Sequence, residues 1–172
     1  MPRLIGLDPG LRATGWGIIE LTGNHLKHVA NGVIHPVQDS EMSLRLNSLF
    51  IELDQVLEKW RPQGAAVESV FVNKDSRASL KLGQARGVVL LAPARRNIPV
   101  AEYAPNQVKK ALVGVGHADK SQIRAMVERL LPGCSVHGSD AADALGVAIC
   151  HAHSAPELRV SPAARAMASH GL

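Results

Sequence analysis

A helical repeat between two short apolar runs constrains the fold of this chain more than any other feature. Apolar residues recur at helical spacing from Leu46 to Trp60, and Arg61-Pro62-Gln63-Gly64 ends the pattern. The apolar runs on either side, residues 3–8 and residues 65–72, have the length of buried strands. Because a strand, a helix and a strand in that order form a crossover, we expect the two strands to lie parallel in one sheet.

Two further strands are predicted between the first strand and this helix. Residues 14–21 and 25–35 have strand patterns, and Thr22-Gly23-Asn24 between them is typical of a hairpin turn. Gly15 and Gly17 would weaken a strand interior, so we expect them to mark a close approach of the backbone near a site. The first three strands are therefore expected to be antiparallel.

The rest of the chain alternates between helical patterns and one short strand. We expect helices at residues 76–91, 105–113 and 140–153, another helix that ends at residue 131, and a strand at residues 100–103. Pro93 should end or kink the first of these helices, and Asp119 or Ser121 can cap the helix that ends at residue 131. The expected fold class is α/β, with a mixed five-stranded sheet of three antiparallel strands and then parallel strands, flanked by helices.

Length and composition favour one domain. A chain of 172 residues, 46% of them hydrophobic, can bury one substantial core, whereas two domains would each be small. We expect a domain at residues 1–155 and a mobile tail at residues 156–172, and we expect Cys134 and Cys150 to be reduced. The sequence has neither a leader pattern nor an apolar stretch that could cross a bilayer, so we expect a cytoplasmic location and no membrane contact.

The distribution of charge is more informative than the total of +4. Residues 74–124 contain ten Lys or Arg and only three acidic residues, so the remainder of the chain is net negative. A basic middle beside an acidic cluster suits a metal-dependent enzyme that acts on a polyanion, although the same charges could also form an ordinary solvated surface.

Four carboxylates stand where burial would be costly without a neighbouring cation. Asp8 and Glu68 each follow an apolar strand pattern, and Asp140 and Asp143 open the last helix. Strand ends and the start of a helix packed on the same sheet can bring all four together. Oxygen ligands without a Cys/His set favour a hard divalent ion such as Mg²⁺ or Mn²⁺ over zinc.

Each carboxylate also has an ordinary structural explanation. Asp140 and Asp143 could cap a helix after Ser139, Asp8 could belong to an Asx turn, and Glu68 could be an edge-strand charge. Four independent structural roles are a less economical explanation than one shared site.

Several sequence blocks, in this order, resemble the RuvC family of Holliday junction resolvases. The blocks are Ile5-Gly6-Leu7-Asp8-Pro9-Gly10 with Thr14-Gly15-Trp16-Gly17, Val67-Glu68-Ser69-Val70-Phe71, Leu80-Lys81-Leu82-Gly83-Gln84-Ala85-Arg86-Gly87, Ala101-Glu102-Tyr103, Gln107-Val108-Lys109, Ala118-Asp119-Lys120-Ser121, and Asp140-Ala141-Ala142-Asp143-Ala144-Leu145. The resemblance covers residues 3–153 and implies an RNase H-like fold, a homodimer and metal-dependent cleavage of four-way DNA junctions. Residues 72–79 depart from the family pattern.

The resemblance also implies roles for individual residues. The family's catalytic and metal-binding acids match Asp8, Glu68, Asp140 and Asp143, which would hold two Mg²⁺ ions per site, with Mn²⁺ able to substitute. The aromatic residue that stacks at the junction centre matches Phe71, and the lysines that contact DNA match Lys109 and Lys120. We add Arg77 and Lys81 of the basic middle as candidate DNA contacts. RuvA and RuvB are the partner proteins that the resemblance implies.

Some of these residues also admit less specific interpretations. Phe71 could simply pack in the core, Lys109 and Lys120 could be solvated, and His137 near Asp140 could be a polar surface residue rather than a proton carrier. Three other functions remain open: a junction-binding module without chemistry, an ATP-binding protein of the sugar-kinase and actin kind, and the related YqgF type of RNase H-like nuclease. The ATP-binding fold needs two such domains and a second phosphate loop, for which this chain is too short.

Overall fold

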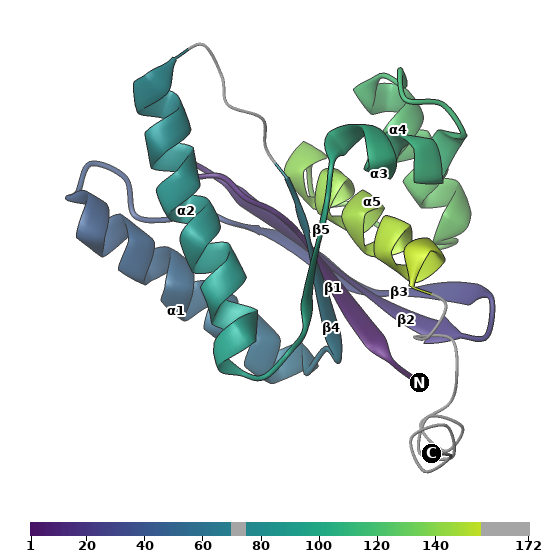
Figure 1. The fold of residues 1–172 in the computed structure, drawn as a ribbon. Helices are drawn as coiled ribbons and strands as arrows, with labels where there is room; N and C mark the ends of the chain where they lie inside the picture. The colour runs from purple at the N-terminus through teal and green to yellow at the C-terminus, as the bar shows by residue number, and fades with distance from the viewer. Residues whose placement is uncertain (70–74, 156–172) are drawn as a thin grey trace, which may run out of the picture.

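One mixed five-stranded sheet carries the helices of this protein (Figure 1). The computed structural model describes residues 1–69 and 75–155. Its strands are β1 (Arg3–Asp8), β2 (Thr14–Thr22), β3 (His25–Ile34), β4 (Gly64–Glu68) and β5 (Val100–Tyr103), and its helices are α1 (Met42–Trp60), α2 (Ser76–Arg95), α3 (Pro105–Val113), α4 (Lys120–Leu130) and α5 (Ser139–Ser154). The strand order is β3-β2-β1-β4-β5, in which β1, β2 and β3 are antiparallel while β4 and β5 run parallel to β1. The predicted mixed sheet is therefore confirmed.

Helices cover both faces of the sheet. Figure 1 shows α1 and α2 on one face, and α5 with α3 and α4 on the other. Successive side chains of β1 point to opposite faces of the sheet and so pack in both cores. Leu4 packs in the cluster under α5, whereas Ile5 and Leu7 pack in the cluster under α1 and α2. No helix among the described residues combines the length and the apolar character that a membrane span requires.

Helix α5 lies unusually close to β1 and β2 because glycines occupy the strand positions beneath it. A Cβ atom on Gly6 would lie 2.0 Å from the carbonyl oxygen of Ala144, and one on Gly15 would lie 2.0 Å from that of Asp140. A Cβ on Gly17 would meet the side chain of Leu145 at 2.6 Å. The predicted close approach at Gly15 and Gly17 is therefore confirmed, and the element that approaches is the helix that carries Asp140 and Asp143.

Three predicted boundaries were wrong. Strand β4 ends at Glu68, before residue 72, because its partner β5 ends at Tyr103 and the last ladder bond is donated by the Ser69 N–H to the Tyr103 carbonyl. Helix α2 continues through Pro93 to Arg95, because Ala92 and Pro93 are buried and their packing favours the helix although proline cannot donate its backbone hydrogen bond. Helix α1 begins at Met42, four residues early, because its first turn is largely exposed and leaves no apolar repeat in the sequence.

Candidate active site

Asp8 and Glu68 end neighbouring parallel strands on the face of the sheet that α5 covers. Leu7 of β1 pairs with Val67 of β4, so the next residue of each strand lies at the same edge. Positions 4, 6 and 8 of β1 share one face, and Gly6 on that face touches α5. The strand geometry therefore directs both carboxylates toward the start of α5.

Asp140 and Asp143 come to the same place from the first turn and a half of α5. Asp8 pairs with Gly15 across the β1–β2 ladder, and Gly15 lies directly against the backbone of Asp140. The N-cap residue of α5 is Gly138, and neither acidic side chain makes a capping hydrogen bond. The helix-capping explanation of this pair is therefore not supported.

The other three carboxylates act on the ionisation of Asp8. Burial, followed by the charges of Glu68, Asp143 and Asp140, raises the pKa of Asp8 from 3.8 to about 8, and the Lys120 charge opposes the shift. Burial is also the main reason that the pKa values of Glu68 and Asp143 are raised. The structure thus brings Glu68, Asp140 and Asp143 close enough to Asp8 for their charges to disfavour its ionisation.

Two contacts fix the strand ends that carry this site. The Thr14 hydroxyl, fully buried, donates to the Gly10 carbonyl at 2.7 Å and closes the turn after Asp8. The Arg86 guanidinium donates to the Glu68 carbonyl at 2.5 Å and also pairs with Glu102. Arg86 therefore joins α2 to the ends of both β4 and β5.

A third contact fixes the segment that leads into α5. The buried amide of Asn31 on β3 accepts from the His137 N–H at 2.9 Å and donates to the Ser135 carbonyl at 2.9 Å. It also contacts His28 Nε2 at 2.8 Å. Sequence reasoning did not identify Asn31, because a single Asn in a strand pattern carries no signal of the loop that it binds.

The predicted basic residues fall into two groups. The charges of Lys109 and Lys120 oppose the rise in the pKa of Glu68 and of Asp143, and Lys120 Nζ lies 3.7 Å from an Asp143 carboxylate oxygen. Arg77 and Lys81 lie on the first turns of α2, on the Asp140 side of the site.

Phe71 lies outside the described residues. His137 is exposed and lies near His28, whose pKa is lowered by burial and by the His137 charge.

The donor set fits a hard divalent cation in its chemistry. Carboxylate oxygens are the ligands that such ions prefer, and a cation would relieve the repulsion that raises the pKa of Asp8. In the present conformation, however, no three His, Cys, Asp or Glu side chains within residues 1–69 and 75–155 are arranged to hold a metal ion.

Cys134 and Cys150 are free thiols, as predicted, and burial raises the pKa of each. Neither contributes to the carboxylate site. The site therefore contains oxygen donors and lysines but no sulfur ligand among its described residues.

Comparison with known proteins agrees with this geometry. The family model described as crossover junction endodeoxyribonuclease RuvC matches residues 4–151. A protein of that name from Ruegeria pomeroyi is 56% identical over 151 residues, which cover 88% of this chain and 91% of the relative. Another from Rhizobium johnstonii is 54% identical over 152 residues, which cover 88% of this chain and 90% of the relative.

Solved structures give the same result. The T. thermophilus RuvC in complex with a Holliday junction substrate matches with a TM-score of 0.85 and 31% identity, covering 91% of this chain and 96% of the other. The yeast mitochondrial Holliday junction resolvase Ydc2, at 14% identity and a TM-score of 0.67 over 99% of this chain and 86% of the other, shares the fold. With a family model that spans most of its length and relatives of more than half identity, this chain belongs to the RuvC family of crossover junction endodeoxyribonucleases.

Proposed function

We propose that this protein is a metal-dependent endonuclease that resolves four-way DNA junctions by paired, symmetric nicks in recombination and repair. The observation that carries the proposal is the buried Asp8, whose ionisation three neighbouring carboxylates oppose and the nearby Lys120 favours. A site of this kind attracts a cation at its centre and a phosphate at its basic edge. The named activity of the close relatives agrees with it.

The four carboxylates would hold two Mg²⁺ ions, which Mn²⁺ could replace. We assign Asp8 as the central ligand shared by both ions, Glu68 and Asp143 as outer ligands, and Asp140 as a ligand or as the proton acceptor for the attacking water. When bound, such ions would supply the activation of water and the stabilisation of the leaving 3′-oxygen.

The remaining residues bind and orient the substrate. Lys109 and Lys120, beside Glu68 and Asp143, would hold the phosphates next to the bond that breaks, and Phe71 would stack on a base at the opened junction centre. Hydrolysis would leave a 5′-phosphate and a 3′-hydroxyl, so the nicks could be ligated.

Paired nicks need two active sites, and we propose a homodimer. Helix α2 exposes Leu80 and Leu91, with Gly83 and Gly87 between them open to space, and α1 exposes Leu44 and Ile51. Apolar side chains at helical spacing on an exposed helix face support association with a second copy. The nuclease domain would be residues 1–155, with RuvA and RuvB as partners and the cytoplasm as its location. The predicted tail, residues 156–172, lies outside the described residues.

A cleavage assay tests the function. Purified protein would be incubated with a four-way junction, a linear duplex and an RNA–DNA hybrid, each with Mg²⁺ and with a chelator. Symmetric nicking of the junction only with metal is the expected result. Binding without nicking would favour a junction-binding module, and preference for the hybrid would favour the YqgF type of nuclease.

A further inference from the structure

Arg86 reaches the candidate active site from the face of the sheet opposite to α5. Glu68 lies two residues after Ala66 on β4, and Ala66 packs in the cluster under α5, so the Glu68 side chain lies on the α5 face. Val67 packs in the cluster under α1 and α2 and pairs with Glu102 of β5, so the Glu102 side chain lies on the α2 face. Arg86 of α2 therefore contacts Glu68 through its backbone and leaves the carboxylate on the other face.

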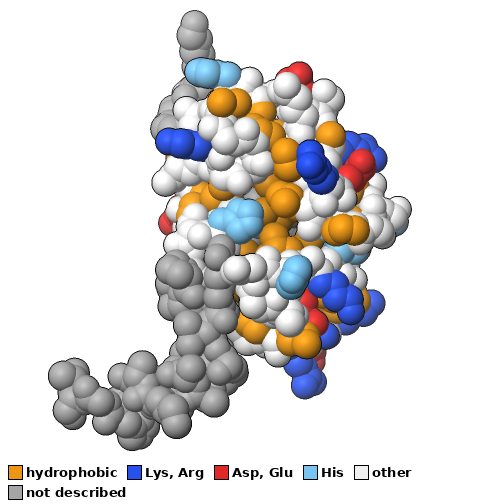
Figure 2. Space-filling model, turned by 90° about the vertical axis from the view of Figure 1, so that its right-hand side faces the viewer, with side chains coloured by type: hydrophobic (Ala, Val, Ile, Leu, Met, Phe, Trp, Pro, Cys, Tyr) orange, Lys and Arg blue, Asp and Glu red, His pale blue; other side chains and the backbone are white. Residues whose placement is uncertain are grey.

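Burial sets Arg86 apart from the surface cations. The Lys and Arg side chains seen in Figure 2 lie toward the edge of the face drawn, where they reach solvent. The Arg86 side chain is only 17% exposed. Removing a guanidinium from water is costly unless its N–H groups are paired. Arg86 meets this cost with two partners, because Nη1 donates to the Glu68 carbonyl at 2.5 Å and Nη2 pairs with a carboxylate oxygen of Glu102.

The two partners lie on neighbouring strands, at the point where the ladder between these strands stops. The last ladder bond between β4 and β5 is donated by the Ser69 N–H to the Tyr103 carbonyl. The planar guanidinium presents two nitrogens in fixed directions, whereas a lysine ammonium is a single point of charge. Arg86 thus bridges the two strand ends in a way that requires the arginine fork.

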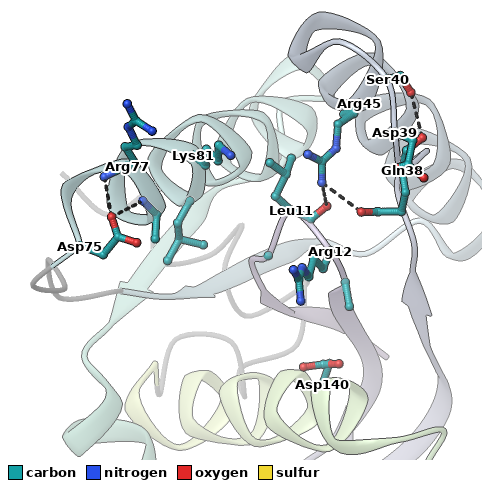
Figure 3. Close-up of a pocket in the computed structure, with 14 residues that line it drawn as sticks. Leu11, Arg12, Gln38, Asp39, Ser40, Arg45, Asp75, Arg77, Lys81 and Asp140 are labelled. Atoms are coloured by element: carbon teal, nitrogen blue, oxygen red, sulfur yellow. Dashed lines mark hydrogen bonds between the residues drawn. The ribbon is translucent and has the colours of Figure 1, made fainter.

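Helix α2 supports this bridge from the core. Ala85 and Val89, on either side of Arg86 in the sequence, are buried in the cluster under α1 and α2. Figure 3 shows the first turns of α2 on one side of the pocket and Asp140 of α5 on the other. The carboxylates are therefore held by α5 on one face of the sheet and, at Glu68, by α2 on the opposite face.

From these observations we propose that Arg86 is a positioning residue that sets the place of the Glu68 carboxylate among the metal ligands, through the Glu68 backbone. The proposal rests on the proposed function, because it takes Glu68 as a ligand of the metal. Residues that hold a metal ligand in place typically contribute about 10- to 100-fold in metal affinity or activity. Loss of Arg86 should therefore weaken metal binding, whereas DNA binding should be kept.

The metal requirement of Arg86 variants tests this proposal. Arg86→Gln would be compared with the unchanged protein for the Mg²⁺ concentration at half-maximal nicking, for junction affinity in chelator, and for the rise in melting temperature that Mg²⁺ produces without DNA. The half-maximal Mg²⁺ concentration should increase about 10-fold or more. The Mg²⁺-dependent rise in melting temperature should become smaller, because the folded state binds the ion more weakly. Arg86→Lys, which keeps the charge but not the fork, should change both quantities in the same direction.

Arg96→Gln is the matched control. Arg96 follows the C-terminal end of α2 and joins it to α1 by pairing with Asp54 at 2.5 and 2.7 Å. Its loss removes an arginine–carboxylate pair of the same helix without touching a strand end of the site. Arg96→Gln should therefore lower the melting temperature and keep the wild-type Mg²⁺ requirement.

The outcomes separate the two proposals. A higher Mg²⁺ requirement in Arg86→Gln alone, with junction affinity kept, supports the positioning role. A wild-type requirement in Arg86→Gln, or an equal increase in Arg96→Gln, makes Arg86 a purely structural residue and overturns the proposal; if Arg86→Gln does not fold, Arg86→Lys decides by the same comparison. Nicking of junctions by the unchanged protein with Mg²⁺ upholds the proposed function in each of these cases, and its absence overturns both proposals.

Discussion

Replacing Asp8 by Asn should stabilise the metal-free protein while removing its activity. The carboxyl of Asp8 is buried among three other carboxylates, and its pKa is raised from 3.8 to about 8. Folding therefore disfavours its ionised form. Asn has nearly the same shape but no charge, so it removes this unfavourable interaction.

The magnitude follows from the shift in pKa. Ionisation of Asp8 reduces stability progressively as the pH rises from the unfolded pKa of 3.8 to the folded pKa of about 8. At pH 7 the cost reaches about 4 kcal/mol at most, since one pKa unit corresponds to about 1.4 kcal/mol. The buried Asn amide keeps part of the polar burial cost, so we expect a net gain of roughly 2–4 kcal/mol. At pH 4 the gain should fall below about 1 kcal/mol, because the carboxyl is then protonated in the folded state and only partly ionised in the unfolded state.

Denaturant unfolding in chelator at pH 7 and pH 4 measures this effect. Asp54→Asn is the matched control, because Asp54 is paired with Arg96 at 2.5 and 2.7 Å and its pKa is lowered. The Asp54 pair is partly exposed, so its loss should reduce stability by no more than about 1 kcal/mol. The two Asp→Asn changes should therefore have opposite signs.

The same preparation tests the role of Asp8 in catalysis. Junction binding should be kept or become tighter, because one negative charge near phosphate is lost, and nicking should disappear. Mg²⁺ should raise the melting temperature of the wild type more than that of the variant. A loss of stability at pH 7, or a gain of equal size at pH 4, would refute the electrostatic argument, and retained nicking would exclude Asp8 as an essential ligand.

Three further predictions test other parts of the site. Lys120→Ala should lower the slope of log K against log salt for junction binding by about 1. It should also move the pH dependence of nicking to higher pH, because the Lys120 charge opposes the rise in the pKa of Asp8. An unchanged slope and pH profile would show that Lys120 is an ordinary surface residue. Phe71→Ala, a prediction from sequence alone, should slow nicking of an intact junction more than nicking of a junction already unpaired at its centre. Stacking on a base is worth roughly 1–3 kcal/mol and offsets the cost of opening base pairs. Equal slowing on both junctions with a large drop in melting temperature would indicate core packing instead. Asn31→Ala should lower the free energy of unfolding by about 2 kcal/mol, because two hydrogen bonds to the backbone are lost. It should also raise the Mg²⁺ concentration needed for half-maximal nicking. Asn47→Ala, on the exposed side of α1, should change neither quantity.

The sheet could be predicted because its signals are local and agree with one another. The apolar run at residues 3–8 ends in Asp8-Pro9-Gly10, and the hairpin turn at Gly23 needs the positive φ of 60° that glycine readily adopts. The crossover through α1 then leaves β4 parallel to β1. Topology alone therefore predicted that Asp8 and Glu68 would lie on neighbouring parallel strands, whereas the end of β4 at Glu68 was not predicted.

Two of the wrong boundaries share one physical cause, because a tertiary contact or its absence decided where β4 and α2 end. The run from Ala65 to Val67 continues as apolar sequence beyond Glu68, but β5 offers no partner past Tyr103. In α2, Ala92 packs in the core and Pro93 beside it is also buried, which favours continuing the helix past the point where Pro93 was expected to end or kink it. Local propensity does not contain these contacts.

The position of Asp140 and Asp143 depends on residues that carry no chemical signal themselves. Gly15 matters because any side chain there would displace the backbone of Asp140, and Asn31 matters because its amide holds the segment between α4 and α5 against the edge strand. Both residues act across more than 100 positions of sequence, and neither has a side chain with charge or nucleophilic character. The carboxylates that would perform the chemistry could be identified from sequence, and so could Gly15 as a point of close approach. The element that approaches Gly15, and the role of Asn31, became identifiable only from the packing of α5 on the sheet. The same reasoning explains why Arg86 escaped notice: its contribution is to hold the strand end that carries Glu68, and that contact exists only in the folded chain.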